Sequence, residues 1–500
     1  MSSTVFLALD LGASSGRHLA GAFDGQRLSL DELYRFENGP VPVAGRLYWD
    51  VLQQWTHVQN GLRAAASAHG NRIRSIGVDT WGVDFGLLGR GDEMLGNPYN
   101  YRDPRTDGML QRAFATVPRE EIFAQTGVQF MQINTLYQLL AMRLGDSPLL
   151  AQATDFLMIP DLFHWLLTGV KANEFTMATT TQFFDPRAGA WAKSLLERFE
   201  IPTAMLGQII NPGEKLGRLT AQVASATHLS NVEVVVPGTH DTASAVMAVP
   251  AVAGSAADSS SQPDWCYISS GTWSLMGVEV AQPIINDKSL ALNFTNEGGV
   301  GGTTRVLKNI CGLWLVQECR RVWSEEGTTY TWEYLTGQAA EAPPLVSLIN
   351  PDDPRFLAPA NMPAVLRDYC RQTAQHVPEG EGEVIRCALE SLALKYRQVL
   401  GWLEELTGGR IATIHIVGGG AQNRQLCQMA ADACNRRVIA GPVEATAIGN
   451  LMMQTIAAGE VASIAEAREV IRRSFSVETY YPRNDAKWDE AYARFTALIG

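Results

Sequence analysis

Two hairpins of unusual composition restrict the folds open to this chain of 500 residues. Residues 5–11 read VFLALDL, a short apolar run typical of a buried strand, and the small residues GASSG separate it from a second apolar strand, RHLAGAF. Residues 264–280, DWCYISSGTWSLMGVEV, repeat this plan with a tip of Ser, Gly and Thr. The likeness predicts two halves that are built alike.

Strands and helices alternate in the rest of the chain. Residues 50–69 have apolar side chains at helical spacing behind a cap at Asp50, and the strand RSIGVDTW follows. NVEVVVPGTHDTASAVMAV reads as strand, turn and helix, and ATIHIVGGGAQN as a strand that ends in three glycines. Residues 384–406 form a long amphipathic helix that Gly408 closes, and residues 104–206 are mostly helical, as in a lid or a substrate-side insertion.

The alternation indicates an α/β fold, and the length exceeds what one hydrophobic core supports. We therefore expect two domains, residues 1–247 and 248–500, with the final helices packing back on the first domain. A Ser-rich segment near the junction is expected to be an exposed loop.

The formal net charge of -12 argues against a nucleic-acid or anionic-membrane partner, because both favour a basic surface. The N-terminus lacks the pattern of a signal peptide, and no apolar stretch is long enough to span a bilayer. We expect a cytoplasmic protein that binds small molecules and needs no obligatory protein partner. The seven cysteines show no C-x-x-C spacing, so zinc is not expected; Cys370 and Cys387 could pair, but reduced thiols are favoured.

Three glycine-containing turns are candidates for binding a nucleotide. Asp10 precedes the first hairpin tip, where a carboxylate beside accessible N–H groups suits a metal-bound phosphate, although an ordinary tight turn is equally consistent. Thr272 stands at the second tip, and residues 418–420 would let an adenine or a phosphate approach the backbone. Neither a P-loop nor a Rossmann fingerprint is present. The pattern matches the actin-like ATPase plan, in which nucleotide lies between two related domains.

Another set of polar residues suits a sugar. Asp241, at the turn in GTHDTASA, could accept the proton of an attacking hydroxyl or simply cap the helix. In DTWGVDF, Trp81 lies between two carboxylates and could face a sugar, but a buried tryptophan is the alternative. Asn309 could bind the sugar or start a helix.

Taken together, these motifs resemble the FGGY family of carbohydrate kinases along nearly the whole chain. The segments that carry the resemblance are LALDLGASSGR, IGVDTWGVDF, YRDPRT, HDTASAV, SSGTWSLMG, TNEGG, RVLKNICGLWLVQ and HIVGGGAQN. The resemblance implies an α/β fold of two actin-like, ribonuclease H-like domains with a nucleotide and sugar cleft between them.

The resemblance also implies roles for the matching residues. ATP would contact Ala13, Ser14, Ser15, Gly16, Arg17, Thr272, Gln317 and Gly419. The sugar would contact Gly82, His240, Asp241, Thr242 and Asn309. Asp241 would accept the proton, and Asp10 would hold Mg²⁺ through water. The implied reaction transfers a phosphoryl group from ATP to the 1-hydroxyl of L-rhamnulose.

Two alternatives remain open from the sequence. A kinase of the same family could act on L-fuculose, L-xylulose or another ketose, because pocket details decide between such sugars. A non-catalytic sugar sensor on the same fold is disfavoured, because the base at Asp241 and the TWGVDF segment are both present.

The sequence departs from the family at two places. The Ser-rich loop at 253–263 is longer than expected for the family. Ala430 stands where some relatives carry a cysteine near Cys434, so that family disulfide cannot form here.

Overall fold

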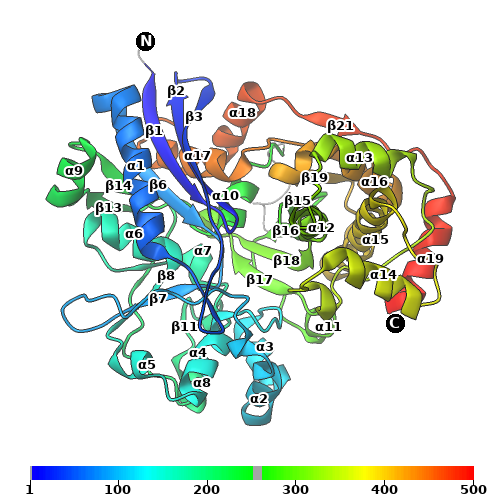
Figure 1. Cartoon of the computed structure of the whole chain (residues 1–500). Coiled ribbons are helices and arrows are strands. Elements are labelled where there is room, and N and C mark those ends of the chain that lie inside the picture. Colours follow the sequence, from blue (N-terminus) through cyan, green and yellow to red (C-terminus); the bar gives the residue numbers. More distant parts are fainter. Residues whose placement is uncertain (1–2, 252–261, 500) are drawn as a thin grey trace. The chain divides into compact units, whose positions relative to one another are not determined.

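The structure is a computed structural model that describes residues 3–251 and 262–499 (Figure 1). The Ser-rich loop expected at 253–263 lies almost wholly outside these residues. The chain forms two compact units. The first unit comprises Met1–Ala257, Glu279–Val306 and Ala445–Phe475, and the second unit comprises Asp258–Val278, Leu307–Glu444 and Ser476–Gly500. The division into domains at residues 247 and 248 remains a prediction.

A six-stranded sheet lies in the first unit, with the strand order β13-β14-β6-β1-β2-β3. Its strands are β1 (Thr4–Leu11), β2 (Ser15–Phe23), β3 (Leu28–Glu37), β6 (Ile73–Thr80), β13 (Lys215–Arg218) and β14 (Glu233–Val235). β1 pairs antiparallel with β2 and parallel with β6, and its side chains are buried from Val5 onward. The continuous apolar run of β1 therefore reflects a central strand that is covered on both faces.

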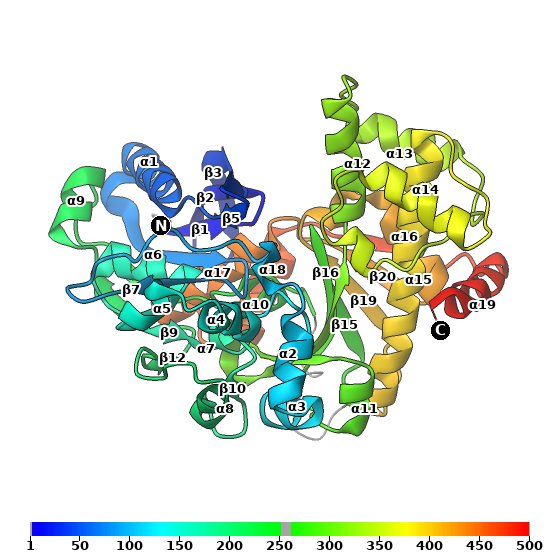
Figure 2. The same ribbon diagram turned by 60° about the horizontal axis from the view of Figure 1, so that its bottom comes forward.

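Helices α1 (Val51–His69) and α17 (Ala445–Ala457) lie on opposite faces of this sheet (Figure 2). Side chains three residues apart on a strand point to opposite faces. On β2, His18 meets Gly61 of α1, whereas Gly21 meets Leu451 of α17. Asp50 caps α1, as predicted, by accepting a 3.0 Å hydrogen bond from the N–H of Gln53.

The segment between β6 and β14 contains a hydrophobic core cluster of its own, and most of its helices lie in residues 104–206, where the sequence predicts a largely helical insertion. Its helices are α2 (Met109–Thr116), α3 (Arg119–Thr126), α4 (Thr135–Leu144), α5 (Pro148–Gln152), α6 (Ile159–Thr168), α7 (Phe175–Ala178), α8 (Lys193–Arg198) and α9 (Ala221–Thr227). The short strands β7 (Phe85–Leu88) and β8 (Asp155–Met158) pair antiparallel at its core. Four more strands are β9 (Asn173–Glu174), β10 (Phe184–Asp185), β11 (Ala190–Trp191) and β12 (Ile209–Ile210).

A seven-stranded sheet has the order β17-β18-β16-β15-β19-β20-β21. Its strands are β15 (Trp265–Ser270), β16 (Trp273–Val280), β17 (Thr295–Gly298), β18 (Thr304–Cys311), β19 (Thr413–Val417), β20 (Arg437–Ala440) and β21 (Glu478–Tyr480). β15 pairs antiparallel with β16 and parallel with β19, which repeats the relation of β1 to β2 and β6. The prediction of two halves that are built alike is confirmed at the level of strand order.

The long helix α15 (Glu381–Thr407) of the second unit begins three residues before its predicted start, and it ends at Gly408, which has a φ of 73°. The apolar stripe that the sequence predicts is buried: Ile385, Leu389, Leu392, Tyr396, Val399 and Leu403. The unit's other helices are α12 (Trp314–Glu325), α13 (Trp332–Glu341), α14 (Met362–Gln372), α16 (Arg424–Cys434) and α19 (Lys487–Ile499).

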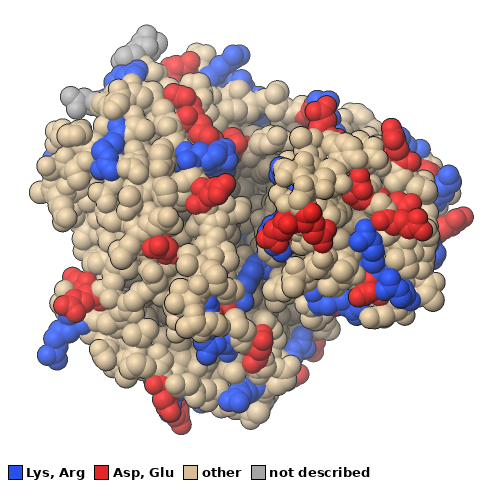
Figure 3. All heavy atoms as spheres, viewed as in Figure 1, with Lys and Arg blue, Asp and Glu red and all other residues tan. Residues whose placement is uncertain are grey.

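The remaining helices and strands belong to the first unit. They are β4 (Val41–Val43), β5 (Arg46–Tyr48), α10 (Asp241–Met247), α11 (Asp287–Ala291) and α18 (Ile464–Ser474). Among the described residues, no helix combines the length and the apolar character that crossing a bilayer requires. On the face shown in Figure 3, acidic and basic side chains are interspersed.

Candidate active site

The first hairpin tip is a braced turn with a carboxylate at its base. The N–H of Gly12 donates a 2.9 Å hydrogen bond to the carbonyl of Ser15, and the side chain of Asn38 donates one of 2.8 Å to the carbonyl of Gly12. Asp10, which is 5% exposed, forms an ion pair with Arg17 across the hairpin. The predicted phosphate residues Ala13 to Arg17 therefore stand together on β2 and its turn, beside the predicted metal ligand.

Three carboxylates converge at the carboxyl ends of the central strands. Asp10 on β1 is in register with Asp79 on β6, and the first residue of α10 is Asp241. Burial raises the pKa of Asp79 well above its usual value, and the charge of the nearby Asp10 raises it further. Burial also raises the pKa of Asp241, against the opposing charge of His240. A bound cation would stabilise the charged forms of these three carboxylates, which otherwise repel one another.

The same carboxylates fit a magnesium ion that keeps part of its water shell. Oδ2 of Asp79 accepts a 2.5 Å hydrogen bond from the Asn450 side chain, whereas its buried Oδ1 has no partner among the described residues. The described residues contain no cluster of three His, Cys, Asp or Glu side chains close enough to bind a metal directly. Mg²⁺ usually binds through one or two carboxylates plus waters and phosphate, so the donor set is of the kind it uses.

Four of the five predicted sugar residues meet at the start of α10. Nε2 of His240 lies 3.5 Å from Oδ1 of Asp241, and the hydroxyl of Thr242 donates a 3.1 Å hydrogen bond to the same oxygen. A Cβ added at Gly82 would lie 3.2 Å from Nε2 of His240, so this glycine leaves the imidazole edge uncovered. The N-cap of α10 is His240, which removes the alternative that Asp241 serves as the cap.

Trp81 is a buried residue and not an exposed platform for a sugar. It is 5% exposed, and its ring lies 4.1 Å, between centroids, from that of Trp49. Of the two interpretations that the sequence left open, the buried tryptophan is confirmed. The adjacent Val83 has a φ of 67°, a conformation that costs a β-branched residue energy and that persists only where surrounding contacts enforce it.

A buried network that the sequence analysis missed supports the loop before Asp241. Oε2 of Glu174 accepts 2.6 Å hydrogen bonds from the hydroxyls of Thr176 and Thr239. The N–H of His240 in turn donates to the Thr176 hydroxyl at 3.2 Å. No local pattern marks Glu174, because its partners are brought to it by the fold.

The predicted nucleotide residues of the second unit also meet. The Thr272 hydroxyl donates a 3.2 Å hydrogen bond to the Gln317 side chain, and the N–H of Trp314 donates to the Thr272 carbonyl, which ties α12 to the hairpin tip. A Cβ at Gly420 would collide with Ser270, whereas one at Gly419 would meet no described atom within 4 Å. Thr272, Gln317 and Gly419 therefore form one group beside β15.

Asn309 lies on β18 in the second unit and is half-buried. It does not start a helix, so that alternative is wrong. The predicted site residues thus fall into two groups, one in each unit, and Asn309 is the predicted sugar residue that belongs to the second unit.

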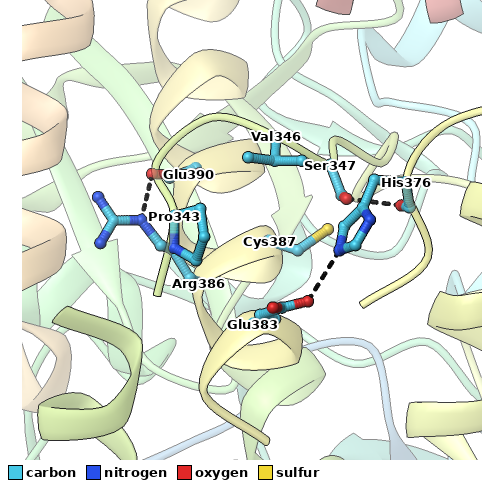
Figure 4. A pocket seen from close by; sticks show the side chains of 8 residues that line it. All are labelled: Pro343, Val346, Ser347, His376, Glu383, Arg386, Cys387 and Glu390. Carbon is cyan, nitrogen blue, oxygen red and sulfur yellow. Dashed lines mark hydrogen bonds and ion pairs between the residues drawn. The ribbon is translucent and has the colours of Figure 1, made fainter. Parts of the chain in front are cut away.

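A pocket in the second unit contains none of these residues (Figure 4). It is open to solvent, with an empty volume of about 260 Å³ that includes part of the solvent, and its lining includes Ser347, His376, Glu383, Arg386, Cys387 and Glu390. Its charged groups pair with one another, His376 with Glu383 at 3.0 Å and Arg386 with Glu390 at 2.7 Å. The pocket therefore offers no unpaired charge to a ligand.

All seven cysteines are buried free thiols, in agreement with the favoured interpretation. Cys370 and Cys387 are neighbours whose thiols share a hydrogen bond, and that bond raises the pKa of Cys387 well above its usual value. A thiol that stays protonated is a poor nucleophile, which applies to Cys387. The same hydrogen bond lowers the pKa of Cys370, which is also buried.

Known proteins are similar to this chain over nearly its whole length. Residues 5–248 match the family model for the N-terminal domain of the FGGY family of carbohydrate kinases, and residues 266–458 match that for its C-terminal domain. A rhamnulokinase of Bacteroides thetaiotaomicron is 44% identical over 494 residues, which cover 99% of both chains. A rhamnulokinase of Bacillus subtilis is 38% identical and covers 96% of both chains.

Solved structures share the fold at lower identity. The ligand-bound xylulose kinase from Lactobacillus acidophilus has a TM-score of 0.81 at 16% identity and covers 99% of this chain and 97% of its own. Glycerol kinase from Plasmodium falciparum, solved with ADP, has a TM-score of 0.75 at 13% identity and covers 99% and 96%. These likenesses confirm the predicted α/β fold class, and with the two domain matches they establish that the chain belongs to the FGGY family of carbohydrate kinases.

Proposed function

We propose that this carbohydrate kinase transfers the γ-phosphoryl group of ATP to the 1-hydroxyl of L-rhamnulose and works in the cytoplasm. The substrate assignment rests on the identity of 38–44% to proteins named rhamnulokinase over nearly the entire chain. The contacts among Gly82, His240 and Asp241 support a sugar site at the start of α10.

Asp241 acts as the proton acceptor in this proposal. As the sugar oxygen forms its bond to phosphorus, the bond from phosphorus to the ADP oxygen breaks and the hydroxyl proton passes to the Asp241 carboxylate. The transition state of phosphoryl transfer is loose, so the base orients the hydroxyl and takes the proton late. The side chain of Asp241 is about one-third exposed, which leaves it accessible to a substrate.

The backbone and hydroxyl groups of Ala13 to Arg17 bind the phosphate chain from one hairpin, and Thr272 binds it from the other. Gln317 and Gly419 contact the nucleotide in the second unit, and Asn309 contacts the sugar. Asp10 would hold Mg²⁺ through water, and the ion, when bound, neutralises charge on the phosphoryl oxygens. In this view the first unit supplies most of the sugar contacts, and the second unit supplies the adenosine contacts together with Asn309.

A coupled ADP-release assay with Mg-ATP tests the proposal across L-rhamnulose, L-fuculose, L-xylulose, D-xylulose and glycerol. We expect L-rhamnulose to give the highest kcat/KM, and Asp241→Asn to lower kcat at least about 100-fold while ATP still binds. Asp287→Asn is the matched control, because Asp287 is likewise the first residue of a helix, α11, in the first unit.

A higher kcat/KM for another ketose would overturn the substrate assignment but leave the proposed mechanism in place. An Asp241→Asn enzyme with full turnover would remove Asp241 from its role as the base.

A further inference from the structure

A buried ion pair between Arg305 and Glu297 contacts the Nδ1 side of the His240 ring. Nδ1 of His240 lies 3.1 Å from Nη2 of Arg305 and 3.3 Å from Oε2 of Glu297. Nη2 of Arg305 also donates a 3.2 Å hydrogen bond to that Glu297 oxygen. All three residues belong to the first unit, and none is more than 6% exposed.

Arg305 is itself fixed in place. Its Nε donates a 2.9 Å hydrogen bond to the carbonyl of Gly298, and its side chain is fully buried. Burial works against the charge of Glu297, but contacts with His240 and Arg305 bring the pKa of its carboxyl below the usual value. Removing one partner of a buried ion pair destabilises the protein, because the other charge is left uncompensated. The positions of Arg305 and Glu297 are therefore strongly constrained.

The contact at Nδ1 decides where the hydrogen of a neutral imidazole resides. A guanidinium has donors only, so a hydrogen bond from Arg305 requires a lone pair on Nδ1. Arg305 approaches Nδ1 at 3.1 Å as a donor, and Glu297, an acceptor, lies slightly farther from the same nitrogen at 3.3 Å. With Nδ1 as the acceptor from Arg305, the hydrogen of a neutral imidazole would be on Nε2, the nitrogen that faces Asp241 at 3.5 Å.

We infer that Arg305 and Glu297 are positioning residues that hold His240 in the Nε2–H tautomer, with this N–H directed at Oδ1 of Asp241. The inference rests on the proposed function for the role of Asp241. The Thr242 hydroxyl donates to the same Oδ1, so both neighbours engage one carboxylate oxygen. The side chains of His240 and Thr242 both contact Oδ1, so we assign Oδ2 as the oxygen that receives the substrate proton.

This arrangement has a clear effect on the reaction. The N–H of His240 and the hydroxyl of Thr242 fix the plane of the carboxylate, so that its second oxygen points in one direction before the sugar arrives. An orienting group that sets a histidine tautomer is known to matter greatly for catalysis in other enzymes. Loss of the pair would lower kcat more than it weakens binding of ATP, which other residues contact.

The first test reads the tautomer directly in the unaltered protein. The enzyme is labelled with ¹⁵N in its eight histidines, and solid-state spectra are recorded for the wild type and for His240→Gln, which identifies the His240 signals by their loss. We expect a protonated Nε2 and an unprotonated, hydrogen-bonded Nδ1. A protonated Nδ1 that donates to Glu297 would overturn the inference.

The second test uses Glu297→Gln and Arg305→Lys. We expect kcat to fall about 10- to 100-fold, the range found when a residue that orients a functional side chain is lost, with the Kd of an ATP analogue unchanged. Glu297→Asp should recover part of the loss. Glu390→Gln is the matched control, because Glu390 is a buried carboxylate paired with Arg386 in the second unit.

The outcomes separate this inference from the proposed function. An active Asp241→Asn enzyme would remove the base assignment, whereas a protonated Nδ1 in an enzyme that needs Asp241 would remove the inference alone. Full kcat in Glu297→Gln and Arg305→Lys would also overturn it. If either variant fails to fold, the tautomer of His240 measured in the wild type still tests the inference.

Discussion

The indole N–H of Trp49 donates a 2.6 Å hydrogen bond to Oδ2 of Asp84, and both side chains are buried. The same oxygen accepts from the indole of Trp81 at 3.0 Å and from the N–H of Tyr101 at 3.2 Å. Oδ1 accepts from the Gln138 side chain at 2.8 Å. Four donors thus converge on one carboxylate, directly after the turn that contains the predicted sugar residue at position 82.

Asp84→Asn should destabilise the first unit by about 2 kcal/mol. The amide brings an N–H₂ group to a place where every neighbour is a donor, so at least one hydrogen bond is lost and a buried donor is left unpaired. Thermal unfolding followed by tryptophan fluorescence measures the effect. Asp92→Asn, in an exposed turn, is the control. An unchanged melting temperature for Asp84→Asn would show that the four hydrogen bonds to this carboxylate do not stabilise the first unit.

The difference between the wild type and Asp84→Asn should also depend on pH. Burial raises the pKa of Asp84 from 3.8 to about 6, although the hydrogen bonds from Trp49, Gln138 and Trp81 oppose the rise. The folded protein therefore binds the proton more tightly, and stability falls as pH rises from about 4 to about 6, by up to about 3 kcal/mol. The amide does not titrate. Urea unfolding between pH 4.5 and 7 should show the advantage of the wild type shrinking as pH rises; a constant or growing advantage would refute the assignment.

Gly82→Ala should raise KM for the sugar about 10-fold or more and leave the fold intact. The new methyl group would stand 3.2 Å from Nε2 of His240 and 3.5 Å from Thr180, close enough to cover the imidazole edge but without severe overlap. Steady-state kinetics with varied sugar and varied ATP separate the two substrates. Gly337→Ala, on α13 of the second unit, is the control, because Gly337 has no atom within 4 Å of its Cβ position and, like Gly82, no positive φ. An unchanged KM for the sugar would show that the substrate does not approach Gly82.

Alanine substitutions at the adjacent residues Gly419 and Gly420 should affect different properties, nucleotide affinity at Gly419 and stability at Gly420. Gly420→Ala places a methyl group 2.0 Å from the Ser270 hydroxyl, so we expect a large loss of stability. Gly419→Ala meets open space, so the protein should fold normally while the affinity for an ATP analogue falls. Calorimetric titration and thermal unfolding measure the two effects. Normal ATP binding by a folded Gly419→Ala protein would exclude a close approach of the nucleotide to this residue.

Asp10→Asn should raise the Mg²⁺ concentration needed for half-maximal turnover about 10-fold, because a carboxylate that attracts the hydrated ion is replaced by a neutral amide. The ion pair with Arg17 is lost as well. The measurement is a Mg²⁺ titration at saturating ATP and sugar. Asp24→Asn makes the same change in the exposed turn between β2 and β3. An unaltered Mg²⁺ requirement in Asp10→Asn would disprove the metal role.

Local pattern was sufficient to predict most of the elements. The apolar runs of β1 and β15 and the small residues after them specify strand and turn, because alternation and backbone freedom act over a few neighbouring residues. The stripe of α15 and the positive φ of Gly408 follow from the same kind of rule. The candidate sites at the hairpin tips were also readable, since a tip of small polar residues exposes backbone N–H groups.

The sequence could not reveal which distant side chains hold these residues in place. Trp49 binds Asp84 across 35 positions, and Asn450 binds Asp79 across 371. Such contacts form only once the sheets and helices have packed, because each needs a long loop to close and leaves no local periodicity. The sequence by itself determined the strands, the turns and the chemistry at their tips. The tertiary structure decided which buried partners orient that chemistry, including Arg305 behind His240.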